Sequence, residues 1–178
     1  MVGLRQLVGA ILIASVVFTG GAAWAAEHKV SATASWQGAG QVFQVSPDEL
    51  LFLGKFEGVM YLEGAAGALD AALLLCPATM TIHVEQQKTS GSGHCIITGS
   101  KGNMAYGKWQ CEGVPGQCVG EMTLTGGSGP YQGLSGSGKM IIRTLLTALA
   151  GDLHNGEVVS GAAGLALWPE LIYRLPGE

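Results

Sequence analysis

Residues 121–139, EMTLTGGSGPYQGLSGSGK, form the stretch that decides the fold class. Glycine dominates from residue 126 to residue 138, and Pro130 and Tyr131 lie near the centre. Because glycine permits positive φ angles and close backbone approach, the stretch predicts a tight corner between two strands of an all-β domain. We assign the structural turn to its glycines: Gly126, Gly127, Gly129, Gly133 and Gly136.

The residues on both sides of this corner favour strands. Before it, Met122 and Leu124 alternate with Glu121 and Thr123, which is the period of a half-buried strand. After it comes KMIIRTLLTALA, residues 139–150, whose β-branched start favours a strand over a helix. Further strands are predicted over 28–36, 42–45, 50–62, 79–85, 94–98, 104–111, 158–167 and 171–174.

Small residues divide these strands. Residues 37–40, QGAG, are expected to end the first strand, and Gly54 and Gly58 are expected to form bulges or bends in the third. Residues 64–74 are rich in alanine and are the one place where a helical turn is expected. Because turn signals recur roughly every 8 to 12 residues, the chain predicts a β-sandwich or a barrel.

The first 25 residues are predicted to be a signal peptide. Arg5 supplies the positive charge, residues 7–18 are an apolar core, and Ala23-Trp24-Ala25 fits a cleavage site. A membrane anchor is the alternative, but the apolar run is too short to span a bilayer. We therefore expect a single domain over residues 26–178, in the periplasm or secreted, without a transmembrane segment.

Charged residues are few and scattered. The formal net charge is −4, only 12% of residues are charged, and no cluster of Lys or Arg occurs. A scattered distribution of this kind argues against nucleic acids and anionic membrane surfaces as partners.

The four cysteines follow the predicted signal peptide and indicate two disulfides. Three pairings are possible, and we favour Cys111–Cys118, which closes a turn at Pro115-Gly116, with Cys76–Cys95 as the second bond. A zinc site is the alternative, but six residues separate Cys111 from Cys118, which is wider than the usual ligand spacing. No metal or other cofactor is expected.

The corner also carries a resemblance to a known family. The run from Thr125 to Gly129, followed by Tyr131, Gly133 and Gly136, resembles the TGGSG-x-aromatic-x-G-x-x-G segment of plant allene oxide cyclases, and dirigent proteins have a related pattern. The resemblance implies an eight-stranded antiparallel, calycin-like barrel with an interior ligand cavity. It covers about 20 residues and transfers no catalytic residue.

Three sequence patterns resemble known functional sites only in part. Residues 133–139 fit G-x₄-G-K, but Met140 occupies the position at which a phosphate-binding loop needs Ser or Thr. His83 and His94 flank a predicted hairpin and, with methionines, are the ligand types of a copper site, although alternating methionines more often fill a core. Ser128 and Ser135 lie in glycine-rich turns, where serine is ordinary, and not in a nucleophile elbow.

The remaining candidates are acidic and aromatic side chains. A carboxylate directed into a barrel cavity would be desolvated and could act as a base. Four glutamates lie within or beside strands: Glu57, Glu63, Glu85 and Glu121. The weak candidates for a ligand site are Trp36, Trp109, Glu57 and His83, with the tryptophans lining a cavity.

Three hypotheses follow for the function. The leading one is an exported barrel that binds a small apolar molecule, a lipid or another envelope component without catalysis. The second is an isomerase or cyclase of the allene oxide cyclase or dirigent type, which holds a reactive substrate in the cavity. The third is a structural or interaction protein whose barrel is filled by its own side chains. A cavity of at least about 300 Å³ is needed by the first two.

Overall fold

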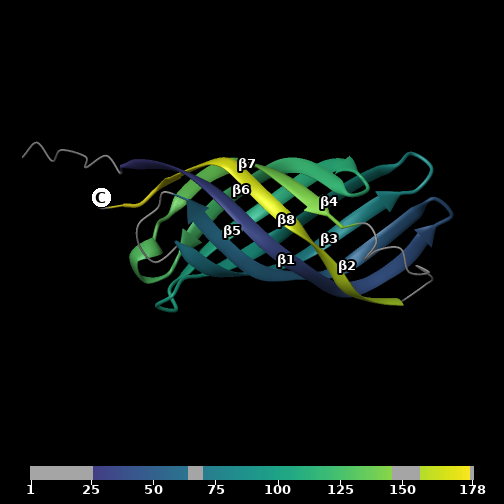
Figure 1. Ribbon diagram of the computed structural model, residues 1–178, viewed down its shortest axis with the longest axis horizontal. Helices are drawn as coiled ribbons and strands as arrows, with labels where there is room; N and C mark the ends of the chain where they lie inside the picture. Colours follow the sequence, from purple (N-terminus) through teal and green to yellow (C-terminus); the bar gives the residue numbers. More distant parts are fainter. Residues whose placement is uncertain (1–25, 64–69, 146–156, 177–178) are drawn as a thin grey trace, which may run out of the picture.

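The protein is an eight-stranded antiparallel barrel, which confirms the predicted fold class (Figure 1). The computed structural model describes residues 26–63, 70–145 and 157–176, so the predicted signal peptide lies outside the described residues. Each strand pairs with the next, and the last pairs with the first. The strands are β1 Glu27–Ser46, β2 Glu49–Glu63, β3 Ala71–His83, β4 Lys88–Thr98, β5 Met104–Val114, β6 Gln117–Gly127, β7 Ser135–Thr144 and β8 Glu157–Arg174.

Strict alternation along the strands separates the interior from the outer wall. In β1, Ala32, Ala34 and Trp36 are buried, while Thr33 and Ser35 between them are exposed. The interior of an eight-stranded barrel is just wide enough for side chains to fill it, so these inward residues form the core. Among the described residues, the largest fully buried side chains are Trp168, Met60, Met122 and Met140.

Inward aromatic rings pack on inward glycines. A methyl group at Gly164 would lie 2.5 Å from Cζ2 of Trp36, and one at Gly93 would lie 2.8 Å from Nε1 of Trp109. These distances are shorter than van der Waals contact, so each ring occupies the space that a side chain would need. Large rings are thereby accommodated in a narrow barrel.

The glycine-rich corner is shorter than predicted and closes one end of the barrel. The turn runs from Ser128 to Leu134 and contains the 3-10 helix η1, Gly129–Tyr131. Gly129 and Gly133 adopt φ angles of 57° and 77°, which a side chain rarely tolerates. The side chains of Tyr131 and Leu134 are buried at this end.

Three of the five glycines assigned to the turn lie in strands. Gly126 and Gly127 end β6, and Gly136 belongs to β7, which begins at Ser135 and not at Lys139. Gly136 faces inward where β7 meets β8, and a methyl group there would lie 2.1 Å from the Ile172 carbonyl oxygen. Its role is close strand approach, so the assignment of Gly136 to the turn was wrong.

The strands at the barrel seam are longer than predicted. β1 continues through residues 37–40, and a register shift against β8 at Gly38/Ala39 takes up the irregularity. β8 likewise continues across Pro169, which lies where the register shifts against both neighbours. Proline has no N–H to donate, so a bulge is the position at which a strand tolerates it.

Two local predictions on β2 and β3 were also wrong. β2 pairs with β3 without a register shift, so Gly54 and Gly58 form no bulge. Residues 71–74 begin β3 instead of forming a helical turn, and their side chains alternate between the outer face and the interior. Residues 64–69 and 146–150 of the predicted segments lie outside the described residues. Among the described residues, no helix has the length and apolarity that a membrane crossing requires.

Both predicted disulfides are confirmed. Cys76 joins Cys95 between β3 and β4, and Cys111 joins Cys118 between β5 and β6. All four side chains point into the barrel. Each bond therefore links two neighbouring strands of one hairpin and contributes to the core.

Candidate functional site

The interior contains two small cavities and no large one among the described residues. The first, of about 40 Å³, lies in the middle of the barrel between Trp36, Trp109, Met122 and Trp168. The second, of about 60 Å³, lies toward the end that holds the turn at Pro115 and Gly116. Ligand pockets usually have about 300–1,000 Å³, so neither cavity has the size of a small-molecule site.

The two predicted aromatic candidates lie in the interior. Trp36 packs edge-on against Phe56 at a centroid distance of 4.9 Å, and Trp109 lies 6.2 Å from the same ring. Aromatic pairs at these separations stabilise each other beyond their buried area. The three rings occupy the centre of the barrel as packing partners.

The two polar candidates lie on the outer wall. Glu57 is exposed and forms an ion pair with Lys55 at 2.7 Å. His83 pairs with Lys88 at the end of β3, while His94 lies six positions further along β4. The two histidines are therefore not brought together, and no group of three metal-ligating side chains occurs among the described residues.

The other glutamates singled out by the sequence are also exposed. Glu63, Glu85 and Glu121 all lie on the outer face or in a hairpin turn. In the described part of the chain, no carboxylate, histidine or asparagine lines either interior cavity. Among the described residues, the lining of these two cavities therefore offers no group with the chemistry of a general base.

Two indole rings place buried polar atoms in the interior. The Nε1–H groups of Trp36 and Trp168 are buried and have no hydrogen-bond acceptor in the described residues. An unpaired buried donor costs about 1–3 kcal/mol. The packing of the two large rings must outweigh that cost.

A cluster of aromatic residues lies beneath the glycine-rich corner. Tyr131 is buried there, and the His28 and Tyr173 rings stack at 5.0 Å. Burial raises the pKa of the Tyr131 phenol, and the nearby Tyr173 raises it further. Because the phenol has a higher pKa in the folded than in the unfolded protein, it contributes to stability below about pH 10. This contribution is lost as the pH rises through the folded-state pKa.

Tyr131→Phe is therefore expected to make the protein less sensitive to alkaline pH. The wild-type free energy of unfolding should fall between about pH 8 and about pH 11, and the variant should lose less over the same interval because it lacks this phenol. Urea denaturation at both pH values measures the difference. Equal losses of unfolding free energy in wild type and in Tyr131→Phe would contradict this prediction.

The outer wall carries two adjoining polar hollows over β2–β7. Their volumes are about 750 and 700 Å³, and both are open to solvent. They share the side chains of Thr79, Ser92, Gln110 and Glu121. This part of the wall is hydrophilic, and its hydroxyl, amide and carboxylate groups face water.

An exposed apolar surface lies beside these hollows on β2–β5. Strand register places Val59 next to Leu73, Leu75 next to Ile96, and Ile96 next to Tyr106. Single exposed apolar residues are normal, but contiguous patches indicate contact surfaces. We call this set the β2–β5 apolar surface: Val59, Tyr61, Ala71, Leu73, Leu75, Ile96, Met104 and Tyr106.

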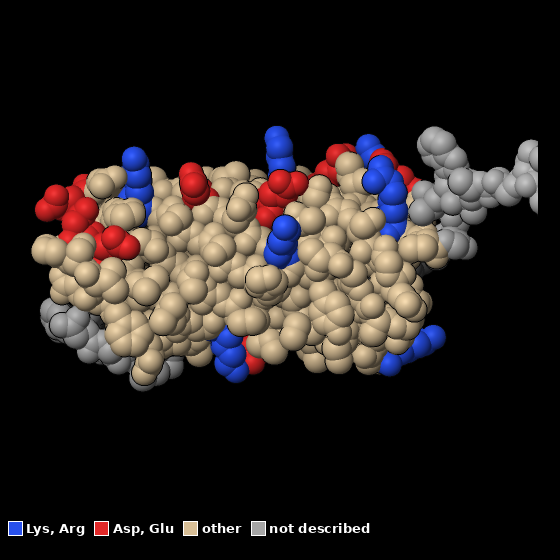
Figure 2. All heavy atoms as spheres, turned by 180° about the vertical axis from the view of Figure 1, so that it is seen from behind, with Lys and Arg blue, Asp and Glu red and all other residues tan. Residues whose placement is uncertain are grey.

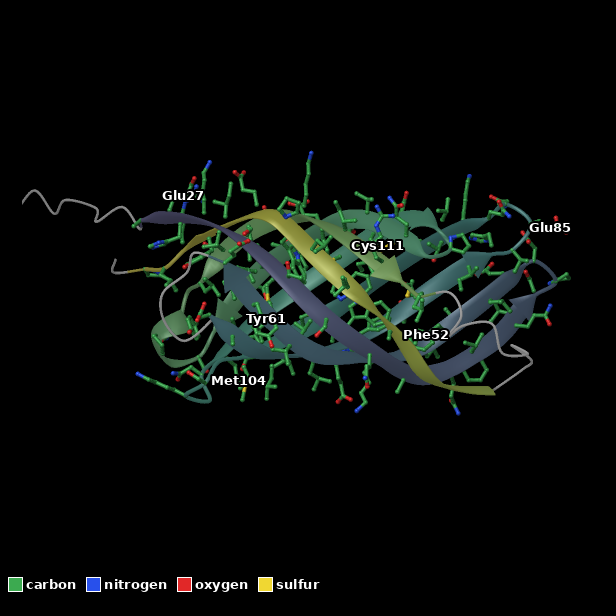
Figure 3. All side chains as sticks on the ribbon, viewed as in Figure 1. Glu27, Phe52, Tyr61, Glu85, Met104 and Cys111 are labelled. Atoms are coloured by element: carbon green, nitrogen blue, oxygen red, sulfur yellow. A yellow bond between two sulfur atoms is a disulfide. The ribbon has the colours of Figure 1, made fainter. Side chains whose placement is uncertain are left out.

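The surface is strongly exposed and lies toward one end of the barrel. Leu73 and Tyr61 keep 65% and 56% of their areas accessible to solvent. Figure 3 shows Tyr61 and Met104 toward the end at which β1 begins, and Glu85 at the opposite end. Figure 2 shows the side of the barrel opposite to that in Figure 1, where a broad area carries no charged side chain.

Sequence reasoning did not find this surface. The alternation of single strands indicates which residues face outward, but Leu73 falls in the segment for which the sequence predicts a helical turn. The surface appears only when four strands are placed in register. No family model, no curated protein and no solved structure matches this chain.

Proposed function

We propose that the protein is a non-catalytic structural or interaction barrel that acts through its outer wall. The observation that carries the proposal is the packed interior, whose cavities of about 40 and 60 Å³ leave little space for a ligand. A small apolar ligand or lipid remains a prediction from the sequence, and it would have to displace core side chains. The outer wall, by contrast, presents an apolar surface ready for contact.

The lining of the interior also supports a role without catalysis. A cyclase or isomerase that controls a reactive substrate needs a preformed cavity and at least one group that stabilises the developing charge. Apolar side chains such as Trp109 and Met122 line the central cavity, and Thr144 is the one hydroxyl-bearing residue among the described residues that line it. The described cavities therefore supply neither the volume for a substrate nor a charged group to stabilise a reacting one, and this favours the proposal over a cyclase or isomerase.

The proposed compartment is the periplasm or the extracellular space. Two disulfides are the mark of an oxidising environment, and they clamp β3 to β4 and β5 to β6. A closed barrel has no free strand edge, so it resists edge-to-edge aggregation. A rigid, cross-linked module of this kind suits a structural or binding role outside the cytoplasm.

Extraction of the purified, disulfide-intact protein tests the proposal. Native mass spectrometry is expected to give the mass of the polypeptide alone, and solvent extracts should contain no apolar compound in stoichiometric amount. The packed interior is the reason for this expectation. Recovery of one compound at about one molecule per barrel would overturn the proposed function.

A further inference from the structure

We infer that the β2–β5 apolar surface is the contact surface for a second copy of this chain. The inference rests on the proposed function, because it takes the outer wall as the working surface. It identifies the partner that the proposed function leaves open.

The area of the surface fits a twofold dimer. From the exposures of its members, with Tyr106 and Met104 near 39% and 38%, the side chains offer on the order of 500 Å² of apolar area. A standard-size interface buries about 800 Å² on each partner, of which about 60% is apolar. The β2–β5 apolar surface thus has about the apolar area that one subunit of such an interface buries. The polar residues around it would form the rim of the interface.

The charges around the surface permit self-contact. A twofold interface places the same patch on both subunits, so a charge inside the patch would approach an equivalent charge across the axis. None of the eight members is charged, and at the border Lys55 and Glu57 already neutralise each other at 2.7 Å. Two copies can therefore meet at this surface without like-charge repulsion at its centre.

Other modes of association fit the wall less well. Every strand of the barrel is paired on both sides, so a partner cannot add a strand to it. An anionic lipid surface would be attracted by clustered basic residues, whereas the chain has a formal net charge of −4 and scattered Lys and Arg. Side-chain packing of the outer wall of one barrel on that of another is the mode that we propose.

Leu73→Glu tests the inference on the full exported chain with its disulfides formed. Sedimentation equilibrium from about 1 to about 100 μM should show a wild-type dimer, because that range resolves micromolar dissociation constants. The variant should dissociate at least about 30-fold more readily, since it buries a carboxylate in the centre of the contact. Circular dichroism and thermal unfolding establish that the variant is folded.

Leu165→Glu is the matched control. Leu165 is 45% exposed on β8, on the other side of the barrel from β4, and the substitution has the same chemistry. It should leave the dimer intact. Equal dissociation of both variants, or a Leu73→Glu variant that dimerises like wild type, would place the contact elsewhere and overturn the inference.

A monomeric wild-type protein over the whole range would also overturn the inference. Binding of that monomer to phosphatidylcholine vesicles, with loss of binding in Leu73→Glu, would assign the surface to lipid instead. Neither result bears on the extraction experiment, whose outcome alone decides whether the interior carries a ligand. The failure of the dimer and the failure of the proposed function are thus distinguishable.

Discussion

Trp168→Ala is expected to lower the free energy of unfolding by about 3–5 kcal/mol, the usual cost of removing a buried large aromatic ring. Trp168 is only 1% exposed and is among the largest fully buried side chains of the described residues. It borders the central cavity together with Met122 and Ala166, so its removal enlarges a void that the neighbouring strands cannot close. Urea denaturation followed by circular dichroism measures the loss.

Trp168→Phe is the matched control for this prediction. Phenylalanine keeps most of the packing, and it removes a buried indole N–H that has no acceptor in the part of the chain that the structure describes. These effects oppose each other, so the change should be smaller than about 1.5 kcal/mol in either direction. An alanine variant that loses no more stability than the phenylalanine variant would show that Trp168 is not a packing residue.

The same pair of variants also bears on the proposed function. The enlarged void in Trp168→Ala is lined by apolar side chains, and apolar voids of sufficient size bind small molecules such as benzene. Benzene should therefore raise the midpoint of thermal unfolding of the alanine variant and leave wild type unchanged. An equal shift in wild type would mean that the native interior already accepts such molecules.

Much of the architecture could be predicted from local sequence. Alternation around Met122 predicts the strand before the corner, and the even number of cysteines with a short Pro-Gly loop predicts Cys111–Cys118. Both depend on interactions between residues that are close in the chain. A closed barrel with short turns consists largely of such neighbouring pairs, and the strand pattern therefore carries the fold class.

The strand ends and the β2–β5 apolar surface depend on pairing between residues that are far apart in the sequence. Residues 37–40 resemble a turn by composition, but pairing with both β2 and β8 keeps them in β1. Gly93 lies just before the strand predicted over 94–98, but the structure places it inside β4, where it leaves space for Trp109 on the neighbouring strand. The β2–β5 apolar surface likewise depends on register, which a single strand does not contain.

Replacing both cysteines of either disulfide by alanine is expected to destabilise the protein, and the Cys76–Cys95 pair should matter more. The bonds close loops with sequence separations of 19 and 7 residues. The chain-entropy relation gives about 3.3 kcal/mol for the longer loop and about 2.5 kcal/mol for the shorter one. Alanine is preferred to serine because all four side chains are buried and a hydroxyl would lack a partner.

Combining the two replacements tests whether the disulfides are needed for folding. Each bond lies within one hairpin, so neither substitutes for the other, and their contributions should add to about 6 kcal/mol. That sum is comparable to the total stability of a typical domain, about 5–15 kcal/mol. The variant without disulfides should therefore be unfolded or close to its unfolding midpoint at about 37 °C. Urea denaturation of the three variants measures this order, and a greater loss from the Cys111–Cys118 pair than from the Cys76–Cys95 pair would contradict the loop-length argument.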